Sequence, residues 1–454
     1  MGYGDFGAFN YGRSSTPMLD ALMREGVLLT QHYSASPICA PARAGLLTGR
    51  YPHRTGAIET RELRGLCNLA LRETTVADLL RDAGYATGLV GKWHNGGVRA
   101  EFHPNARGFD EFAGFRSGWQ DYYNWVLDRN GSFEKPDGRY LTDVFTDESV
   151  QFIERHRAEP FFLHVCYNAP HTPLQAPEDD VRPFAETGAF TDAVSTIYGM
   201  IRRMDAGVGR ILDALRAHGL EENTFVLFTS DNGPQFGGLG QGCTTRFNCG
   251  LNGSKSFVYE GGIRVPMILR WPAALEGGRT VHRMVHFCDW LPTLLSAAGL
   301  PAPQGLKLDG CDVLPALRGE DGDVPSRRFW QWNRYQPLVT SNAAVRDGDW
   351  KLVRPAIEET FWTDPAEQER DSAYRDEPWR AVEPVTGDFP PRHVPPPRPP
   401  QLFNIAADPL EREDLARRHP ARVAEMLREL ERWFEDVEAD RASIGGPWSR
   451  SLSP

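Results

Sequence analysis

The stretch SPICAPARAGLLTGRYPHRTG, residues 36–56, joins a helix-forming run to an unusually placed cysteine. Pro41 has the fixed φ that suits a first helical position, and Gly49 suits the residue that ends a helix. Cys39 then lies just ahead of the helix N-terminus, where free N–H groups and the helix dipole lower the pKa of a thiol. The stretch by itself leaves two interpretations open, a reactive cysteine or a buried cysteine beside an ordinary helix.

Helical and strand-like segments alternate along the chain on both sides of this stretch. Helical patterns follow Thr16-Pro17 and Thr74, and others lie near 143–157 and 192–218. Each precedes an apolar run: VLLTQHY (27–33), YATGLVGKWH (85–94), PFFLHVCYNAPH (160–171) and NTFVLFTSDNG (223–233). Alternation of this kind predicts an α/β fold with a largely parallel sheet covered by helices on both faces.

The pattern changes near residue 325. NAAVRDGDWKLVRP (342–355) predicts two strands joined by an Asp-Gly turn, and ARVAEMLRELERWFEDV (421–437) has the spacing of an amphipathic helix. Between them, EPVTGDFPPRHVPPPRPP (383–400) is too rich in proline for regular structure. We therefore predict a main domain over residues 1–325 and a smaller α+β domain over residues 326–454, with a proline-rich surface loop near residues 380–400.

Composition narrows the class of protein. The 454 residues carry a net charge of −11, which disfavours a general nucleic-acid binder, and no apolar run approaches the length of a membrane span. The opening MGYGDFGAFN lacks the basic and apolar regions of a signal peptide. The seven cysteines show no paired spacing, which is compatible with one functional cysteine. Arginine is used almost throughout, so each of the five lysines attracts attention: Lys92, Lys135, Lys255, Lys307 and Lys351.

Three polar clusters come directly after predicted strands: GKWH (91–94), NAPHTP (168–173) and SDNG (230–233). Ligands of open α/β sheets bind outside the carboxyl ends of the strands, so these loops are expected to converge on one site. Taken singly, each cluster has a structural interpretation. His94 or His171 alone is typical of a hydrogen-bonded structural histidine, and the Asp231-Asn232-Gly233 run alone is typical of a turn.

Together the clusters form a coherent chemical set. Cations are available for a tetrahedral oxyanion, imidazoles for acid–base work, and hard oxygen ligands for Ca²⁺ or Mg²⁺. These groups are, in turn, Arg43, Lys92 and Lys255; His94 and His171; and Asp231 and Asn232. With a nucleophile at Cys39, the set predicts transfer of a sulfuryl or phosphoryl group.

In their order these motifs resemble the formylglycine-dependent, arylsulfatase-like sulfatases of the alkaline phosphatase superfamily. CAPAR (39–43) with LLTGRYPHRTG (46–56) is similar to the family's Cys-x-Pro-x-Arg signature, although Ala42 replaces the commoner serine. GKWH, PHTP (170–173), SDNG and SKSFVYEGGIRVP (254–266) follow in the family's order, and AVRDGDWKLV (344–353) and LFNIAADPLERED (402–414) resemble its C-terminal domain. The resemblance implies an alkaline phosphatase-like α/β/α sandwich with a mixed, largely parallel sheet.

The resemblance also implies a mechanism for sulfate monoester hydrolysis. A formylglycine-generating enzyme reads the Cys-x-Pro-x-Arg segment and oxidises Cys39 to formylglycine, whose hydrated aldehyde attacks sulfur. His171, together with Lys255, assists the departing alcohol, and His94 takes a proton from the second hydroxyl. Arg43 holds the nucleophile, and Lys92 and Lys255 bind sulfate oxygens. Modified Cys39, Asp231 and Asn232 are expected to bind Ca²⁺ or Mg²⁺.

One departure from the family concerns the start of the chain. Family members have an apolar strand that ends in an Asp-Asp pair before GYGD, whereas here GYGD is residues 2–5 and only Met1 precedes it. Asp231 and Asn232 alone are too few ligands for a hard dication. We expect that the sequence starts at an internal methionine of a longer protein, upstream of which any export signal would lie, so the location in the cell stays open. The alternative is a truncated, non-catalytic homologue that binds sulfated ligands.

Two further questions concern the substrate. Some members of the superfamily hydrolyse phosphonate or phosphate esters, and this remains the alternative reaction. ARGFDEFAGFRSGWQDYYNWVLDRNG (106–131) is rich in aromatic residues that can stack on sugar rings, which indicates a pocket for a sulfated carbohydrate. Simple packing of these aromatic residues is an equally good interpretation: Trp119, Tyr122, Tyr123 and Trp125.

Overall fold

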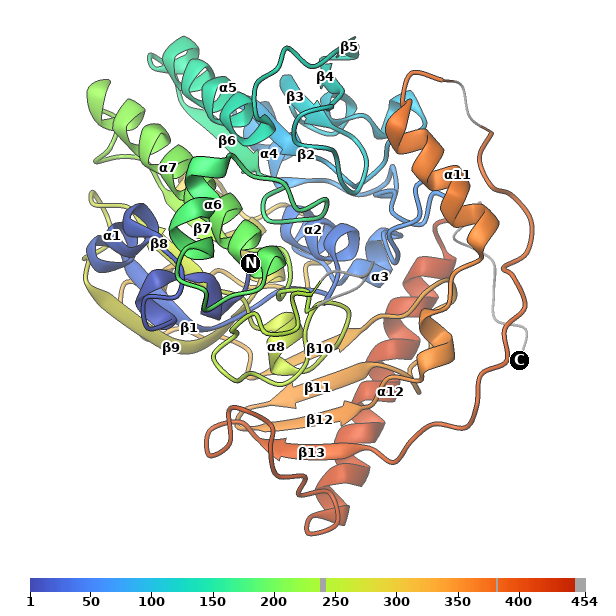
Figure 1. Ribbon diagram of the computed structural model, residues 1–454. Coiled ribbons are helices and arrows are strands. Elements are labelled where there is room, and N and C mark those ends of the chain that lie inside the picture. The colour runs from blue at the N-terminus through green and yellow to red at the C-terminus, as the bar shows by residue number, and fades with distance from the viewer. Residues whose placement is uncertain (237–241, 381–382, 446–454) are drawn as a thin grey trace.

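The main sheet of the protein is divided into two parts (Figure 1). The structure is a computed structural model that describes residues 1–236, 242–380 and 383–445. The first part has the order β7 (Val226–Thr229), β8 (Met267–Arg270), β1 (Val27–Tyr33), β9 (Arg279–His286). The second has the order β5 (Ser132–Glu134), β4 (Leu127–Arg129), β3 (Glu111–Phe115), β2 (Ala86–Lys92), β6 (Phe161–Cys166).

Parallel and antiparallel neighbours are mixed in both parts. In the first, β1 and β9 are parallel, while β8 is antiparallel to β1 and β7. In the second, β6, β2 and β3 are parallel, and β4 and β5 form an antiparallel extension. The mixed sheet is therefore confirmed, although three of the seven strand pairs in its two described parts are parallel and four are antiparallel.

Helices cover both faces of this divided sheet. Successive side chains of β2 point to opposite faces of the sheet. Leu89 packs with residues of α2, α4 and α9 on one face, and Val90 packs with residues of α5 and α7 on the other. This is the predicted α/β/α arrangement. The helices of the main domain are α1 (Pro17–Glu25), α2 (Cys39–Thr48), α3 (Pro52–Thr55), α4 (Val76–Asp82), α5 (Leu141–His156), α6 (Glu178–Ala185), α7 (Asp192–Ala217), α8 (Glu260–Ile263), α9 (Trp290–Ala297) and α10 (Leu314–Leu317). Short 3₁₀ turns lie at Tyr3–Asp5, Gly7–Phe9, Ala100–Phe102, Pro104–Ala106, Phe287–Asp289 and Glu358–Phe361.

Two strand edges stay open where the sheet is divided. Within the described part of the chain, β6 pairs only with β2, and β7 pairs only with β8. All four residues of β7 and five of the six in β6 are half-buried rather than buried. Leu163 of β6 and Phe228 of β7 nevertheless border the same hydrophobic cluster. The two edges thus adjoin one core without a hydrogen-bonded ladder between them.

A separate antiparallel sheet forms the C-terminal part. Its order is β10 (Arg327–Gln331), β11 (Ala343–Asp347), β12 (Trp350–Arg354), β13 (Gln401–Asn404), and the long helix α12 (Pro420–Ala442) crosses it (Figure 1). The predicted Asp347-Gly348 turn joins β11 and β12, and Gly348 takes the positive φ of 56° that such a turn requires. Helix α11 (Pro365–Asp376) lies between β12 and β13 in the sequence and packs over the loops of the main domain.

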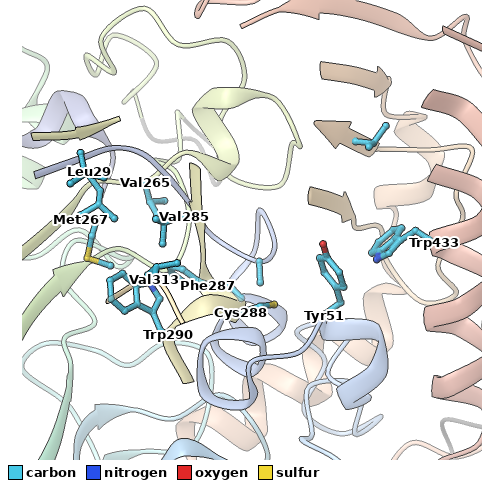
Figure 2. Packing of buried hydrophobic residues seen from close by; sticks show 14 of the residues in the cluster. Leu29, Tyr51, Val265, Met267, Val285, Phe287, Cys288, Trp290, Val313 and Trp433 are labelled. Carbon is cyan, nitrogen blue, oxygen red and sulfur yellow. The ribbon is translucent and has the colours of Figure 1, made fainter. Parts of the chain in front are cut away.

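A continuous hydrophobic core joins the C-terminal sheet to the main domain (Figure 2). It includes Met267 of β8 and Trp290 of α9 at one end and Trp433 of α12 at the other. The ring centroids of Tyr51 and Trp433 lie 5.2 Å apart in an edge-on contact, so the loop after α2 is held directly by α12. Among the described residues, no helix has the length and apolar character needed to cross a membrane.

Candidate active site

Cys39 is the first residue of α2, not the residue before it. The predicted N-terminus was Pro41, but helical geometry begins two residues earlier, after the N-cap Ile38, whose side chain makes no capping hydrogen bond. The predicted end is confirmed, because Gly49 closes α2 with a φ of 68°. Cys39 is a free cysteine and is only 3% exposed. Its sulfur therefore lies buried at the positive end of the helix dipole.

Arg43 lies one helical turn after Cys39 and connects two of the polar loops. Its Nε donates to Asp231 Oδ2 at 3.1 Å, and its Nη1 donates to the Lys92 carbonyl at 2.9 Å. The guanidinium is nearly buried, so the two bonds fix both loops against α2. This contact confirms that the loops after β2 and β7 converge.

The loop after β2 begins with Lys92, the last residue of that strand, and continues to His94. Both side chains are buried. His94 has a φ of 61°, in the left-handed region that non-glycine residues rarely adopt, and its N–H donates to the Arg116 carbonyl at 3.0 Å. Burial and the charge of Lys92 lower the pKa of His94 to about 4, so its imidazole is neutral near pH 7.

The loops after β6 and before α8 meet in a direct contact between His171 and Lys255. The distance from Lys255 Nζ to His171 Nε2 is 3.0 Å, and that from His171 Nδ1 to the Thr172 carbonyl is 2.9 Å. An ammonium group donates and a carbonyl accepts, so the hydrogen of the neutral ring lies on Nδ1 and Nε2 accepts from Lys255. Burial, with the charge of Lys255, lowers the pKa of His171.

These groups act together on the Cys39 sulfur. Burial by itself raises the pKa of a thiol, but the charges of Lys255 and Lys92 and the nearby imidazoles of His171 and His94 together outweigh it. The pKa of Cys39 is consequently held well below its usual value. The site is a buried cationic cluster that stabilises negative charge at residue 39, which is the property that a tetrahedral oxyanion requires.

Asp231 and Asn232, after β7, were predicted to bind a divalent metal. Asn232 Oδ1 is buried and makes no hydrogen bond to any described residue, as expected of an oxygen that awaits a ligand. Asp231, however, pairs with Arg43, and the described ranges 1–236, 242–380 and 383–445 contain no cluster of three or more histidine, cysteine or acidic residues able to hold a metal ion. Two oxygen ligands do not make a Ca²⁺ or Mg²⁺ site. These residues therefore do not fit a complete metal centre by themselves.

Sequence reasoning missed a second layer of polar groups behind His94. Glu62 and the Thr60 carbonyl face its imidazole, and Arg375 of α11 lies behind Glu62. Burial raises the pKa of Glu62 to about 7, and Asp371 adds to the effect. No motif marks these residues. Glu62 lies in an irregular loop, and Arg375 is more than 300 positions after Glu62 in the sequence.

The aromatic residues of segment 106–131 were expected either to contact a sugar or simply to pack, and the structure distinguishes two groups among them. Tyr122 and Trp125 are buried in a hydrophobic cluster with α5 and α7, so they pack. Tyr123 is 37% exposed and contacts the ring of Tyr140. Trp119 is half-buried beside the site, with the Arg375 guanidinium 4.8 Å from its ring centroid. Trp119 and Tyr123 remain candidates for contact with a substrate.

Comparison with protein families agrees with this geometry. The family model described as "Sulfatase" matches residues 1–300 of the 454-residue chain. The chain belongs to the sulfatase family. A second model, described as "N-sulphoglucosamine sulphohydrolase, C-terminal", matches residues 253–381, so the sulfatase family match extends into the C-terminal sheet.

Individual sulfatases are similar over most of the chain. The N-acetylgalactosamine-6-sulfatase of Canis lupus familiaris is 37% identical over 357 residues, covering 70% of this chain and 64% of the relative. Arylsulfatase J of Mus musculus is 31% identical over 466 residues, covering 95% of this chain and 73% of the relative. The crystal structure of Ps i-CgsB in complex with k-i-k-neocarrahexaose superimposes with a TM-score of 0.78 at 30% sequence identity. The match covers 95% of this chain and 90% of the Ps i-CgsB chain. The chain thus spans just under two thirds of the N-acetylgalactosamine-6-sulfatase that it matches.

Proposed function

We propose that the protein hydrolyses a sulfate monoester, R–O–SO₃⁻ with water giving the alcohol, sulfate and a proton. The observation that carries the proposal is the convergence of Lys92, Lys255, His94 and His171 on a buried Cys39 at the N-terminus of α2. Membership of the sulfatase family supports the same reaction.

The nucleophile that we propose is formylglycine at position 39. Formylglycine supplies a hydrated aldehyde, one hydroxyl of which attacks sulfur. Around it, Lys92 and Lys255 bind the sulfate oxygens and stabilise the charge that develops on them. We assign protonation of the departing alcohol to His171 together with Lys255, which contact each other directly, and acceptance of a proton at residue 39 to the neutral His94. No step is assigned to a metal, because the described residues provide only part of a metal centre.

Conversion of Cys39 requires a partner, for which we propose a formylglycine-generating enzyme. Cys39, Pro41 and Arg43 are all buried in the folded protein, and the segment is helical. An enzyme that binds this segment as an extended peptide therefore has to act before α2 folds.

The proposed substrate class is a sulfated carbohydrate. The similar proteins include an N-acetylgalactosamine-6-sulfatase and a structure in complex with k-i-k-neocarrahexaose. In this chain, Trp119 lies beside Arg375, and the exposed Tyr123 follows Tyr122, whose hydroxyl donates to the His171 carbonyl at 3.0 Å. Replacing either by Ala should alter relative rates across a panel of sulfated sugars, and unchanged specificity would remove them from the binding surface.

The experiment that tests the function uses protein produced together with a formylglycine-generating enzyme. Peptide mass analysis reports whether residue 39 is a thiol or an aldehyde. Release of sulfate from p-nitrophenyl sulfate and sulfated sugars is then measured beside hydrolysis of a phosphate diester and a phosphonate monoester. Cys39→Ala is the matched control. We expect sulfate release only from converted protein; aldehyde-bearing protein that prefers the phosphorus esters would contradict the proposal.

A further inference from the structure

The imidazole of His94 is held from behind by three groups of the irregular loops. His94 Nε2 lies 3.3 Å from the Thr60 carbonyl oxygen and 3.7 Å from Glu62 Oε1. Glu62 Oε1 in turn accepts the Gly118 N–H at 2.9 Å. The side chains of His94 and Glu62 are 4% and 1% exposed, so both groups are shielded from bulk solvent.

This environment fixes the tautomer of the neutral ring. A carbonyl oxygen only accepts hydrogen bonds, and Glu62 Oε1 is already oriented as an acceptor by Gly118. Both groups therefore favour a hydrogen on Nε2. Nδ1 is left with a free lone pair; it is buried and has no hydrogen-bond partner among the described residues. Because Nε2 is engaged on the loop side, Nδ1 is the nitrogen available to residue 39, with which His94 interacts.

We infer that Glu62 is a positioning residue for His94: with the Thr60 carbonyl it holds the Nε2–H tautomer and directs the basic Nδ1 toward residue 39. The inference rests on the proposed function for its catalytic meaning. In the reaction, the proton of the second hydroxyl at residue 39 passes to Nδ1, the O–H electron pair becomes the second bond of the aldehyde C=O, and the C–O bond to sulfate breaks so that sulfate leaves with that bond's electrons. Nε2 keeps its hydrogen, so the resulting imidazolium points a positive N–H at Glu62.

Two backbone features keep the ring in this position. A Cβ added to Gly118 would lie 2.8 Å from His94 Cε1 and 2.9 Å from Nε2, so glycine is needed for the loop to approach the ring. The unusual φ of His94 is maintained by its N–H bond to the Arg116 carbonyl. Behind Glu62, Arg375 Nη1 lies 3.9 Å from Oε2 and balances the carboxylate charge.

The tautomer is measurable without catalysis. Protein labelled with ¹⁵N-histidine is examined by long-range ¹H–¹⁵N correlation in the Cys39→Ala background, because that variant removes the thiolate that would compete for a ring hydrogen. His94→Gln assigns the signal. We expect a pyrrole-type Nε2 and a pyridine-type Nδ1. The reverse assignment would overturn the inference, whatever the activity of the enzyme.

Variants of Glu62 test its part. Glu62→Gln keeps an acceptor oxygen and should keep the Nε2–H tautomer of His94. Glu62→Ala should give a mixture of tautomers. In protein that carries formylglycine, Glu62→Ala should also lower kcat at least tenfold while KM changes less than twofold. Glu73→Gln is the control, because Glu73 is an equally buried carboxylate that pairs with Arg50, away from His94. An Ala variant with unchanged tautomer and kcat, or a Glu73 variant with the same effects, would overturn the inference.

Gly118→Ala supplies a second route if Glu62→Ala does not fold. It leaves Glu62 in place but displaces the ring, so the His94 signals should shift and kcat should fall; unchanged signals and kcat would count against the positioning geometry. If the tautomer behaves as expected but converted protein releases no sulfate from any ester, the proposed function fails while the geometry around His94 stands.

Discussion

Replacement of the buried Lys351 by Met is expected to destabilise the protein strongly. Lys351 of β12 lies 2.9 Å from Glu260 Oε1 and 2.9 Å from Glu411 Oε1, and the side chains of all three are fully buried. Glu260 belongs to α8, which follows the Lys255 loop, so the lysine ties the candidate site to the C-terminal sheet. Lys351→Met leaves two carboxylates buried without their shared cation, which costs about 3–5 kcal/mol.

Thermal unfolding measures this loss. Over 454 residues, an unfolding entropy of about 2.1 cal/mol/K per residue amounts to about 1 kcal/mol/K, so a two-state transition should shift by roughly 3–5 °C. Lys307→Met is the matched control, because Lys307 pairs with Asp436 at 3.3 Å on the surface and its loss costs at most about 1 kcal/mol. Equal shifts for the two variants would refute the reasoning from burial.

The loss of stability in Lys351→Met should depend on pH. Burial, with the charge of Glu260, raises the pKa of Glu411 to about 7. At Glu260 burial also acts to raise the pKa, but Lys351, Arg264 and Arg346 together outweigh it and lower the pKa to about 2. A carboxyl whose pKa is raised by folding holds a proton that the unfolded chain releases, so its contribution to stability increases as pH falls from 8 to 5. Without Lys351 both carboxyls gain from protonation, although Tyr33 and Arg264 still face Glu260. The stability deficit of Lys351→Met should therefore be smaller at pH 5 than at pH 8; equal deficits would contradict this.

Further predictions concern α2 and α4. Arg43 reaches Asp231 and the Lys92 carbonyl from two separate nitrogens of one planar group, which the single nitrogen of lysine does not reproduce. Arg43→Lys should therefore lower kcat/KM for a sulfate ester about tenfold or more, since one charge-assisted bond is worth about 1.5–3 kcal/mol; a change below twofold would be inconsistent with this role. Both Gly49 and Gly84 have positive φ, but only at Gly49 would an added Cβ lie 3.1 to 3.3 Å from atoms of neighbouring residues. Gly49→Ala should therefore lower the free energy of unfolding, measured by denaturant titration, by about 1–3 kcal/mol more than Gly84→Ala. Thr75→Ala should cost about 1 kcal/mol through loss of its capping box, and Thr74→Ala much less; the opposite order would reassign the cap.

Much of the fold could be predicted because strand ends and helix ends carry local signals. The loops after β2, β6 and β7 each place polar residues at the end of an apolar strand. Parallel pairing brings the ends of β2 and β6 together, and Arg43 links the loop after β7 to the end of β2. The Asp347-Gly348 turn was readable for a similar reason, since few residues accept positive φ. Boundaries were less certain: Thr75 rather than Thr74 caps α4, because both have the same side chain and only the bond to the Asp78 N–H distinguishes them.

The remainder depends on contacts between distant segments. Glu62 and Gly118 matter to His94 only because two irregular loops fold against it, and no periodicity encodes that approach. Arg375 reaches the same place from α11, after the chain has built most of the C-terminal sheet. Sequence patterns predicted the groups that perform the proposed chemistry, whereas the groups that hold them became visible only in three dimensions.

The open edges of β6 and β7 have a consequence for handling the protein. In the described residues, each edge presents a row of backbone donors and acceptors without ladder partners, flanked by half-buried apolar side chains. Such rows act as templates for strands of other chains. A preparation of this chain should therefore self-associate as its concentration rises, and amides of β6 and β7 should exchange with deuterium sooner than those of β1 and β2, which have neighbours on both sides. The line along which the sheet is divided is thus one place where this molecule can pair with another polypeptide.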